Sequence, residues 1–211
     1  MKTIKDIPRP FFEIYYFCAV TAFAIIYTFP LITNLGGIFY GFPWDSIGGI
    51  WNLWWLKFSY LNNISFYTHT YLSYPSGYDL SNHPYPYLFN FIGFLLTYFT
   101  NEIVAFNIIK LISFPALALT TYFLIYYLTV NKAISAITGL IYAFSPFHAI
   151  HNMAHFANLY WLPLAVLFFL KLLRECGYRN AILFGIFWGF VFVDNAYYAY
   201  FLGLLVPVFI T

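Results

Sequence analysis

Asp45 is the carboxylate whose position in this sequence points most directly to chemistry. It follows Phe42-Pro43-Trp44, just beyond the first hydrophobic stretch, and a tryptophan-rich segment comes next. Charged residues make up only 8% of the chain, so each carboxylate needs an explanation. A carboxylate at such a boundary can accept a proton as a general base. The alternative is that Asp45 caps the helix that follows it, a common role for aspartate.

A helix is predicted over residues 46–61, where the spacing of large apolar residues places them on one face. These residues are Ile47, Trp51, Trp54 and Phe58. Tryptophan is enriched at membrane interfaces, so we expect this helix to lie in the interface plane. Gly48-Gly49 weakens a helix and therefore predicts a close approach of its backbone to another group.

A row of histidines forms the second candidate site. His148, His151 and His155 are spaced three and four residues apart, and Asn158 extends the same helical face. Such a row can contact a phosphate or a sugar, hold a metal ion, or be satisfied inside a helix bundle. No carboxylate lies between the histidines, so no cofactor is assigned and a divalent metal is left open.

Three further polar positions complete the candidates. Asp194 and Asn195 interrupt the last apolar run, where they can bind an acceptor hydroxyl or simply end a helix. His83 lies in a long polar loop and is a weaker substrate-binding candidate. Lys110 sits about two turns into an apolar run, where snorkelling toward water is the simpler expectation and contact with a phosphate the alternative.

The elements that must position these residues are membrane helices. The chain is 63% hydrophobic and 26% aromatic, with a mean hydropathy of +0.75, which excludes an ordinary soluble domain. We therefore expect an all-α, polytopic transmembrane bundle with no nucleic-acid partner. Its apolar runs cover about 11–33, 85–99, 103–130, 133–150, 156–173 and 180–211. The last run is too long for one helix and is expected to turn near Asp194.

The distribution of basic residues predicts the orientation of the bundle. Run 85–99 is short and begins after two prolines, so it is expected to be interfacial or re-entrant. With that assignment, the N-terminal basic residues, Lys132 and the cluster 171–179 all fall on the cytoplasmic side, as the positive-inside rule requires. Loop 34–102 then becomes the first extracytoplasmic loop, carrying interfacial helices. All the candidate site residues lie on that outer face of the cell membrane.

The first run has basic residues before it but no cleavage site, so it is expected to be an uncleaved anchor. Cys18 and Cys176 fall at different depths, and no disulfide is expected between them. The chain ends inside an apolar run. We therefore expect one transmembrane domain over residues 1–211, truncated at its C-terminus.

The order of these features resembles the N-terminal part of GT-C-type integral membrane glycosyltransferases, a superfamily that includes protein O-mannosyltransferases and aminoarabinose transferases. After the first span come Asp45, the pair Trp51 and Trp54, and a Tyr-Pro-x-Gly loop. Val104-Ala105-Phe106-Asn107 follows a short apolar segment. The histidine segment, which begins Phe-Ser-Pro-Phe-His, then leads into Trp-Leu-Pro-Leu. The resemblance covers about residues 11–200, and its specificity lies in order and spacing.

The resemblance implies sugar transfer from a polyprenyl-phosphate donor to a glycan, lipid or protein acceptor at the outer face of the bilayer. Asp45 would be the general base, and the polyprenyl phosphate would leave with inversion. His148 stands where relatives often carry arginine, so the histidines would meet phosphate or sugar. Asp194 stands where relatives are often small and polar.

Two other classes of protein fit the same composition. A multi-span transporter or flippase would place ionisable residues near the middle of the membrane and break its helices there. A non-catalytic membrane subunit is the third class. The clustering of polar residues at one face favours the glycosyltransferase.

Overall fold

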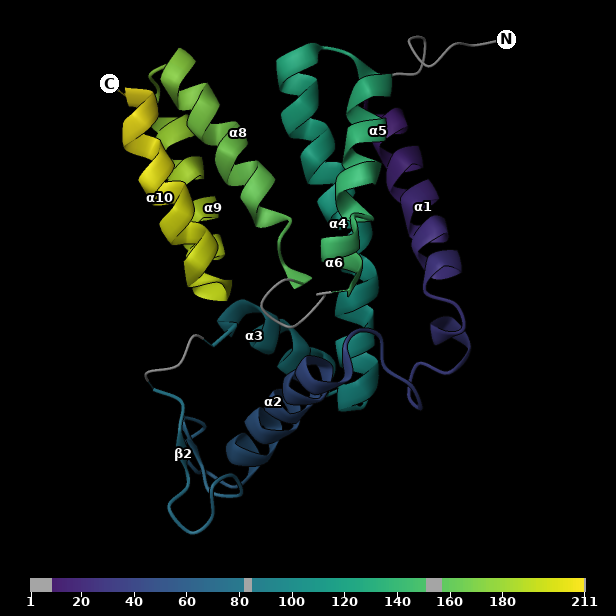
Figure 1. Ribbon diagram of the computed structural model, residues 1–211, viewed down its shortest axis with the longest axis vertical. Coiled ribbons are helices and arrows are strands. Elements are labelled where there is room, and N and C mark those ends of the chain that lie inside the picture. Colours follow the sequence, from purple (N-terminus) through teal and green to yellow (C-terminus); the bar gives the residue numbers. More distant parts are fainter. Residues whose placement is uncertain (1–8, 82–84, 151–156, 211) are drawn as a thin grey trace.

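The computed structural model describes residues 9–81, 85–150 and 157–210, and helices dominate it (Figure 1). Helix accounts for 74% of the structure and strand for 2%, which confirms the all-α prediction. Three predicted site residues, His83, His151 and His155, lie outside the described residues.

The long helices lie side by side in two groups (Figure 1). The first group is α1 (Arg9–Tyr27), α4 (Glu102–Thr129) and α5 (Lys132–Ala143); the second is α8 (Trp161–Arg174), α9 (Tyr178–Asp194) and α10 (Ala196–Ile210). Each group has its own apolar core, the first around Leu117 and Ala118 and the second around Ala165 and Phe169. Contacts between α4 and α8 join the two groups.

Most of the remaining elements form what we call the end layer, at one end of the helix groups (Figure 1). It consists of α2 (Pro43–Leu61), α3 (Tyr87–Leu96), and strands β1 (Thr68–His69) and β2 (Tyr78–Asp79). The short α6 (Pro146–Ile150) follows α5 and lies beside α4 (Figure 1). The strands pair antiparallel, with Thr68 opposite Asp79. A 3-10 turn, Leu31–Thr33, follows α1.

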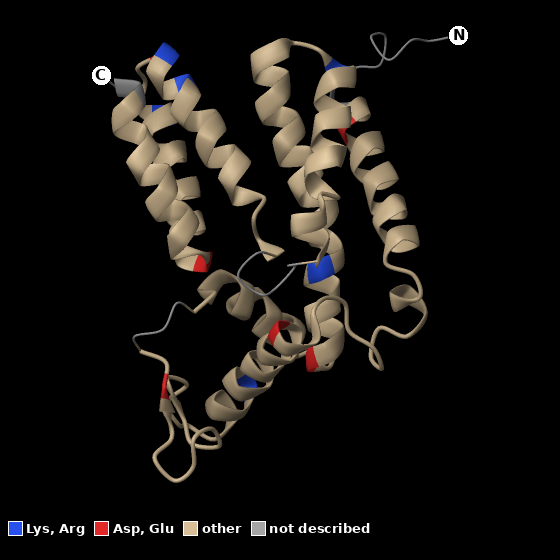
Figure 2. Ribbon diagram, viewed as in Figure 1, with Lys and Arg blue, Asp and Glu red and all other residues tan. Residues whose placement is uncertain are grey.

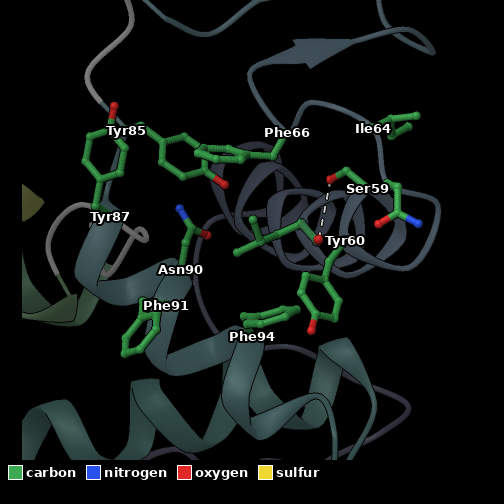
Figure 3. A pocket seen from close by; sticks show the side chains of 11 residues that line it. Ser59, Tyr60, Ile64, Phe66, Tyr85, Tyr87, Asn90, Phe91 and Phe94 are labelled. Carbon is green, nitrogen blue, oxygen red and sulfur yellow. Dashed lines mark hydrogen bonds between the residues drawn. The ribbon is translucent and has the colours of Figure 1, made fainter.

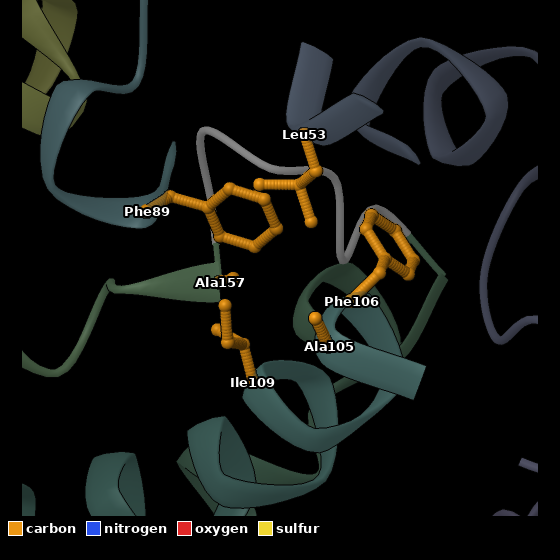
Figure 4. Packing of buried hydrophobic residues seen from close by; sticks show 6 residues of the cluster. All are labelled: Leu53, Phe89, Ala105, Phe106, Ile109 and Ala157. Atoms are coloured by element: carbon orange, nitrogen blue, oxygen red, sulfur yellow. The ribbon is translucent and has the colours of Figure 1, made fainter. Parts of the chain in front are cut away.

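A third apolar cluster packs the end layer against α4 (Figure 4). Leu53 of α2, Phe89 of α3 and Phe106 of α4 are all fully buried in it. Gly93 lets α2 and α3 approach closely, because a Cβ atom at this position would collide with the side chain of Leu53. This packing holds α2 and α3 at the start of α4.

Among the described residues, α4 is the one helix that is both long enough and apolar enough to cross a membrane. Two predicted spans end earlier than expected, each at a proline. Run 11–33 stops being helical after Tyr27, shortly before Pro30. Run 133–150 breaks after Ala143, because Pro146 disfavours helical geometry at the residue before it.

Of the predictions about the other apolar runs, the turn within run 180–211 is confirmed, and the interfacial or re-entrant placement of run 85–99 stays a prediction. Within run 85–99, α3 has only 10 residues, a rise of about 15 Å, which is half the thickness of a hydrocarbon core. Run 180–211 turns at the predicted place, since α9 ends at Asp194 and α10 begins at Ala196. Cys18 and Cys176 are both free and exposed in the structure.

Candidate functional site

Asp45 lies in the first turn of α2 and is partly exposed. It is not the capping residue: Phe42 occupies the N-cap position and Pro43 the first helical position, with no side-chain hydrogen bond to the cap. The capping alternative is therefore wrong, because proline shifts the helix start ahead of Asp45. The positive end of the helix dipole still favours a carboxylate in this turn.

The predicted helix after Asp45 is confirmed, but its faces differ from expectation. Trp51 and Trp54 form a partly exposed aromatic surface, with ring centroids 4.9 Å apart, while Leu53 and Trp55 are fully buried. Gly48 approaches nothing: a Cβ atom added there would meet open space. The expected close approach is therefore absent at Gly48.

The structure shows a further residue, Lys110, close to Asp45. Its side chain is 0% exposed, and its ammonium lies 4.9 Å from the ring centroid of Phe106 and 5.7 Å from that of Phe89. The Asp45 carboxylate is close enough to act on it electrostatically. The snorkelling expectation is wrong, because α2 and α3 cover this part of α4.

His148 reaches the same place from α6. It is 1% exposed, its Nδ1 donates to the carbonyl oxygen of Ala143 at 2.8 Å, and its Nε2 lies 3.5 Å from Ser113 Oγ. A carbonyl oxygen only accepts, so Nδ1 carries the proton and Nε2 of the neutral ring is an acceptor. Lys110 also acts electrostatically on His148. Asp45 and His148 thus both interact electrostatically with the buried Lys110 side chain.

Asn107 positions the loop that leads to Asp45. This fully buried residue lies one turn before Lys110 on α4. Its Nδ2 donates to the carbonyl oxygens of Leu35 and Ile38, at 2.8 and 2.7 Å, and its Oδ1 accepts from the backbone N–H of Tyr40 at 3.2 Å. Because one side chain satisfies three backbone groups of the loop, the entry to α2 is fastened directly to α4.

Asp194 and Asn158 meet in a separate cluster. Asp194 Oδ1 accepts from the backbone N–H groups of Leu88 and Phe89 at the start of α3, at 2.9 and 3.0 Å. Its Oδ2 accepts from Asn158 Nδ2 at 2.6 Å. Asn195 Oδ1 accepts from the backbone N–H of Tyr198 in the first turn of α10.

The cavity beside Asp194 and Asn158 measures only about 10 Å³, room for about one water molecule. The geometry describes a structural role for these residues. The substrate-binding role that the sequence predicts for Asn158, Asp194 and Asn195 stays a prediction.

Charge is distributed unequally between the two ends of the molecule (Figure 2). Lys132 begins α5, Lys171 and Arg174 lie in the last turn of α8, and Arg179 is in the first turn of α9. Figure 1 shows these helix ends at the same end as the start of α1, opposite the end layer. Asp45, by contrast, lies in the end layer.

The predicted site residues that the structure describes thus fall into two groups. One lies around Asp45 and His148, and the other around Asp194 and Asn158. The sequence did not predict that Lys110 would be buried, and it assigned no role to Asn107. A lone lysine inside an apolar run was the available signal, because a buried charge needs a partner. The described residues contain no group of three or more potential metal-binding side chains.

Comparisons of the chain with protein-family models, with curated proteins and with solved structures found no match.

Proposed function

We propose that this chain is a membrane glycosyltransferase, or the N-terminal part of one, that uses a polyprenyl-phosphate sugar donor at the extracytoplasmic face. One observation carries the proposal: the partly exposed Asp45 carboxylate is close enough to the fully buried Lys110 side chain to interact with it electrostatically, at one end of the bundle. No hydrogen bond joins the Asp45 carboxylate to another residue that the structure describes. Its oxygens are therefore available to an acceptor hydroxyl.

The proposed membrane arrangement follows from the two ends of the molecule. The helix ends that carry Lys132, Lys171 and Arg174 would face the cytoplasm, and the end layer would lie at the outer interface. Exposed aromatic side chains in α2 and α3 support this placement, with Trp44 80% and Phe91 58% exposed. The helices beside α4 would complete a polytopic bundle, although most are shorter than a full span.

In the proposed reaction, Asp45 accepts the proton of an acceptor hydroxyl. The hydroxyl oxygen forms a bond to the anomeric carbon of the donor sugar as the bond from that carbon to the phosphate oxygen breaks. The electron pair leaves with the polyprenyl phosphate, so configuration inverts and no other reactant is needed. General-base catalysis of this kind contributes typically ~10²–10⁴-fold.

Lys110 would take part in the same site through its electrostatic interaction with Asp45. His148 offers a polar ring on the other side of Lys110 and is the described residue best placed to contact phosphate or sugar. His151 and His155 retain their predicted contact roles.

Replacement of Asp45 by asparagine tests the proposal. Membranes containing the protein are assayed with undecaprenyl phosphate carrying radiolabelled hexoses or pentoses, and transfer is measured. Asp45→Asn should reduce transfer at least 100-fold, whereas Glu175→Gln, at an exposed carboxylate of the opposite end, should leave it unchanged. Equal rates for Asp45→Asn and the wild type would refute the assigned base, and a wild type inactive with every donor would count against the activity itself.

A cysteine-labelling experiment tests the orientation separately. With Cys18 and Cys176 replaced by serine, a cysteine at Tyr74, which is 86% exposed in the end layer, should react with an impermeant maleimide from outside intact cells. A cysteine at Val130, 75% exposed at the other end, should react only after lysis. The reverse pattern would invert the proposed topology.

A transporter or flippase is the second candidate, and Lys110 is the observation that favours it. The residue lies about 12 Å along α4 from its start, inside the one helix that passes the span test. Buried ionisable residues in spanning helices often mark transport pathways. Movement of a fluorescent polyprenyl phosphate across proteoliposomes, abolished by Lys110→Met and retained in Asp45→Asn, would select this alternative.

A further inference from the structure

A large cavity lies between α2 and α3, away from Asp45 (Figure 3). Its volume is about 560 Å³, within the usual range for small-molecule sites. Most of the lining is aromatic or aliphatic, and the aromatic part is Tyr60, Phe66, Tyr85, Tyr87, Phe91 and Phe94. Tyr60 is 64% exposed and Phe91 58% exposed, so apolar side chains also form the rim of the opening.

Two polar groups inside this cavity lack partners. Asn90 is 1% exposed, and neither its Oδ1 nor its Nδ2 has a hydrogen-bond partner among the described residues. The hydroxyl of Tyr85, a residue 6% exposed, is unpartnered in the same part of the structure. Figure 3 shows both groups pointing into the space between the aromatic rings. Leaving such groups unsatisfied costs about 1–3 kcal/mol each, so a ligand that pairs with them gains affinity.

The described lining of the cavity favours a neutral ligand over a charged one. The described residues that line it include no acidic or basic side chain to balance an ionised ligand. The hydroxyl of Ser59 is already used within α2, where it donates to the carbonyl oxygen of Trp55. A neutral group that both donates and accepts hydrogen bonds matches the carboxamide of Asn90, and a hydroxyl is the simplest such group.

We propose that this cavity binds a neutral long-chain alcohol, with the hydroxyl at Asn90 and Tyr85 and the aliphatic chain leaving past Phe91 and Tyr60. The site is separate from the proposed catalytic group. Leu56, the first residue of α2 in the lining, follows Asp45 by 11 positions, a rise of about 16 Å. Asp45 is not among the described residues that line the cavity, and the inference does not depend on sugar transfer.

Photocrosslinking with matched probes tests this assignment. The full chain in nanodiscs is exposed to a diazirine-bearing dodecanol, to the corresponding diazirine dodecane and to the dodecyl phosphate, and labelled peptides are identified by mass spectrometry. The alcohol should label residues 56–66 and 85–94 at least five-fold more than the alkane or the phosphate. Equal labelling by the alkane would show that the cavity is an apolar groove without preference for a hydroxyl. Stronger labelling by the phosphate would show that the preferred ligand is anionic. Absence of labelling would refute the site.

Two variants connect the preference to the unpartnered groups. Asn90→Leu keeps a side chain of similar size but removes both polar atoms, so labelling by the alcohol should fall to the level of the alkane. Tyr85→Phe removes only a hydroxyl, should fold even if Asn90→Leu does not, and should reduce the preference at least two-fold. Asn180→Leu, at a partly exposed asparagine whose Nδ2 donates to the carbonyl oxygen of Glu175 at the opposite end, is the matched control. An unchanged preference in both cavity variants would refute the proposed contacts.

Discussion

Two carboxylates at the same end of the bundle are held in opposite ways. Asp194, at the end of α9, is 4% exposed, and its two oxygens accept three hydrogen bonds from α3 and Asn158. Asp45, at the start of α2, is partly exposed, accepts no hydrogen bond from the described residues and interacts electrostatically with Lys110. Asp194 is therefore saturated by the fold, whereas Asp45 retains acceptor capacity for a molecule from outside.

The difference arises from the position of each carboxylate relative to the helix ends. Asp194 ends its own helix, where the dipole is unfavourable, but it stabilises the first turn of α3 by accepting the unpaired N–H groups there. Asp45 lies in the first turn of its own helix and caps nothing. Asp194 therefore joins α9 to α3, whereas the Asp45 carboxylate joins no two elements that the structure describes.

Removal of each side chain should separate the two roles most clearly. Asp194→Ala leaves the start of α3 and Asn158 without their acceptor and should lower the free energy of unfolding by about 2–4 kcal/mol. Asp45→Ala should change it by about 0.5 kcal/mol or less, because no hydrogen bond is lost. Denaturation in a mild detergent measures both. Equal losses for the two variants would remove the distinction.

Acid should weaken the end layer through His69. Burial lowers the pKa of His69 to about 4, and its Nδ1 accepts from Trp51 Nε1 at 3.0 Å, so the folded protein keeps this ring neutral. The unfolded chain binds a proton below pH ~6.5, so stability is full above that pH and falls as the pH approaches 4. Between pH 7 and pH 5 we expect a loss of about 1–2 kcal/mol.

Denaturation midpoints at several pH values measure this loss. His69→Gln keeps an acceptor for Trp51 without a titrating group and should flatten the slope between pH 6.5 and pH 5. An unchanged slope in that variant would assign the pH dependence to other groups.

Substitution of two glycines by alanine should change stability with opposite signs. Gly48→Ala, near Asp45, adds a methyl group in open space and should stabilise α2 by about 0.5–1 kcal/mol. Gly93→Ala, in the packed part of α3, should destabilise by about 1–2 kcal/mol, because the buried Leu53 must move. Melting temperatures of both variants measure this pair; stabilisation by Gly93→Ala would show that α2 and α3 are loosely packed.

Some elements of this structure were predictable because local patterns specify them. The helix after Asp45, the short helix in run 85–99 and the turn at Asp194 follow from apolar periodicity, from proline and from the unfavourable position of a charge inside an apolar run. The helix ends near Pro30 and Pro146 were misjudged because hydropathy measures composition and does not register the loss of a backbone donor.

The amino-acid sequence by itself determined that the chain is helical and apolar, and it placed the basic residues at alternate helix ends. Only the tertiary structure decided the partners of each polar group. Lys110 is buried beside Asp45 because α2 and α3 fold over α4, and Asp194 caps α3 although 105 positions separate it from Phe89. Such contacts depend on how distant helices pack, and no local pattern along the chain encodes that packing.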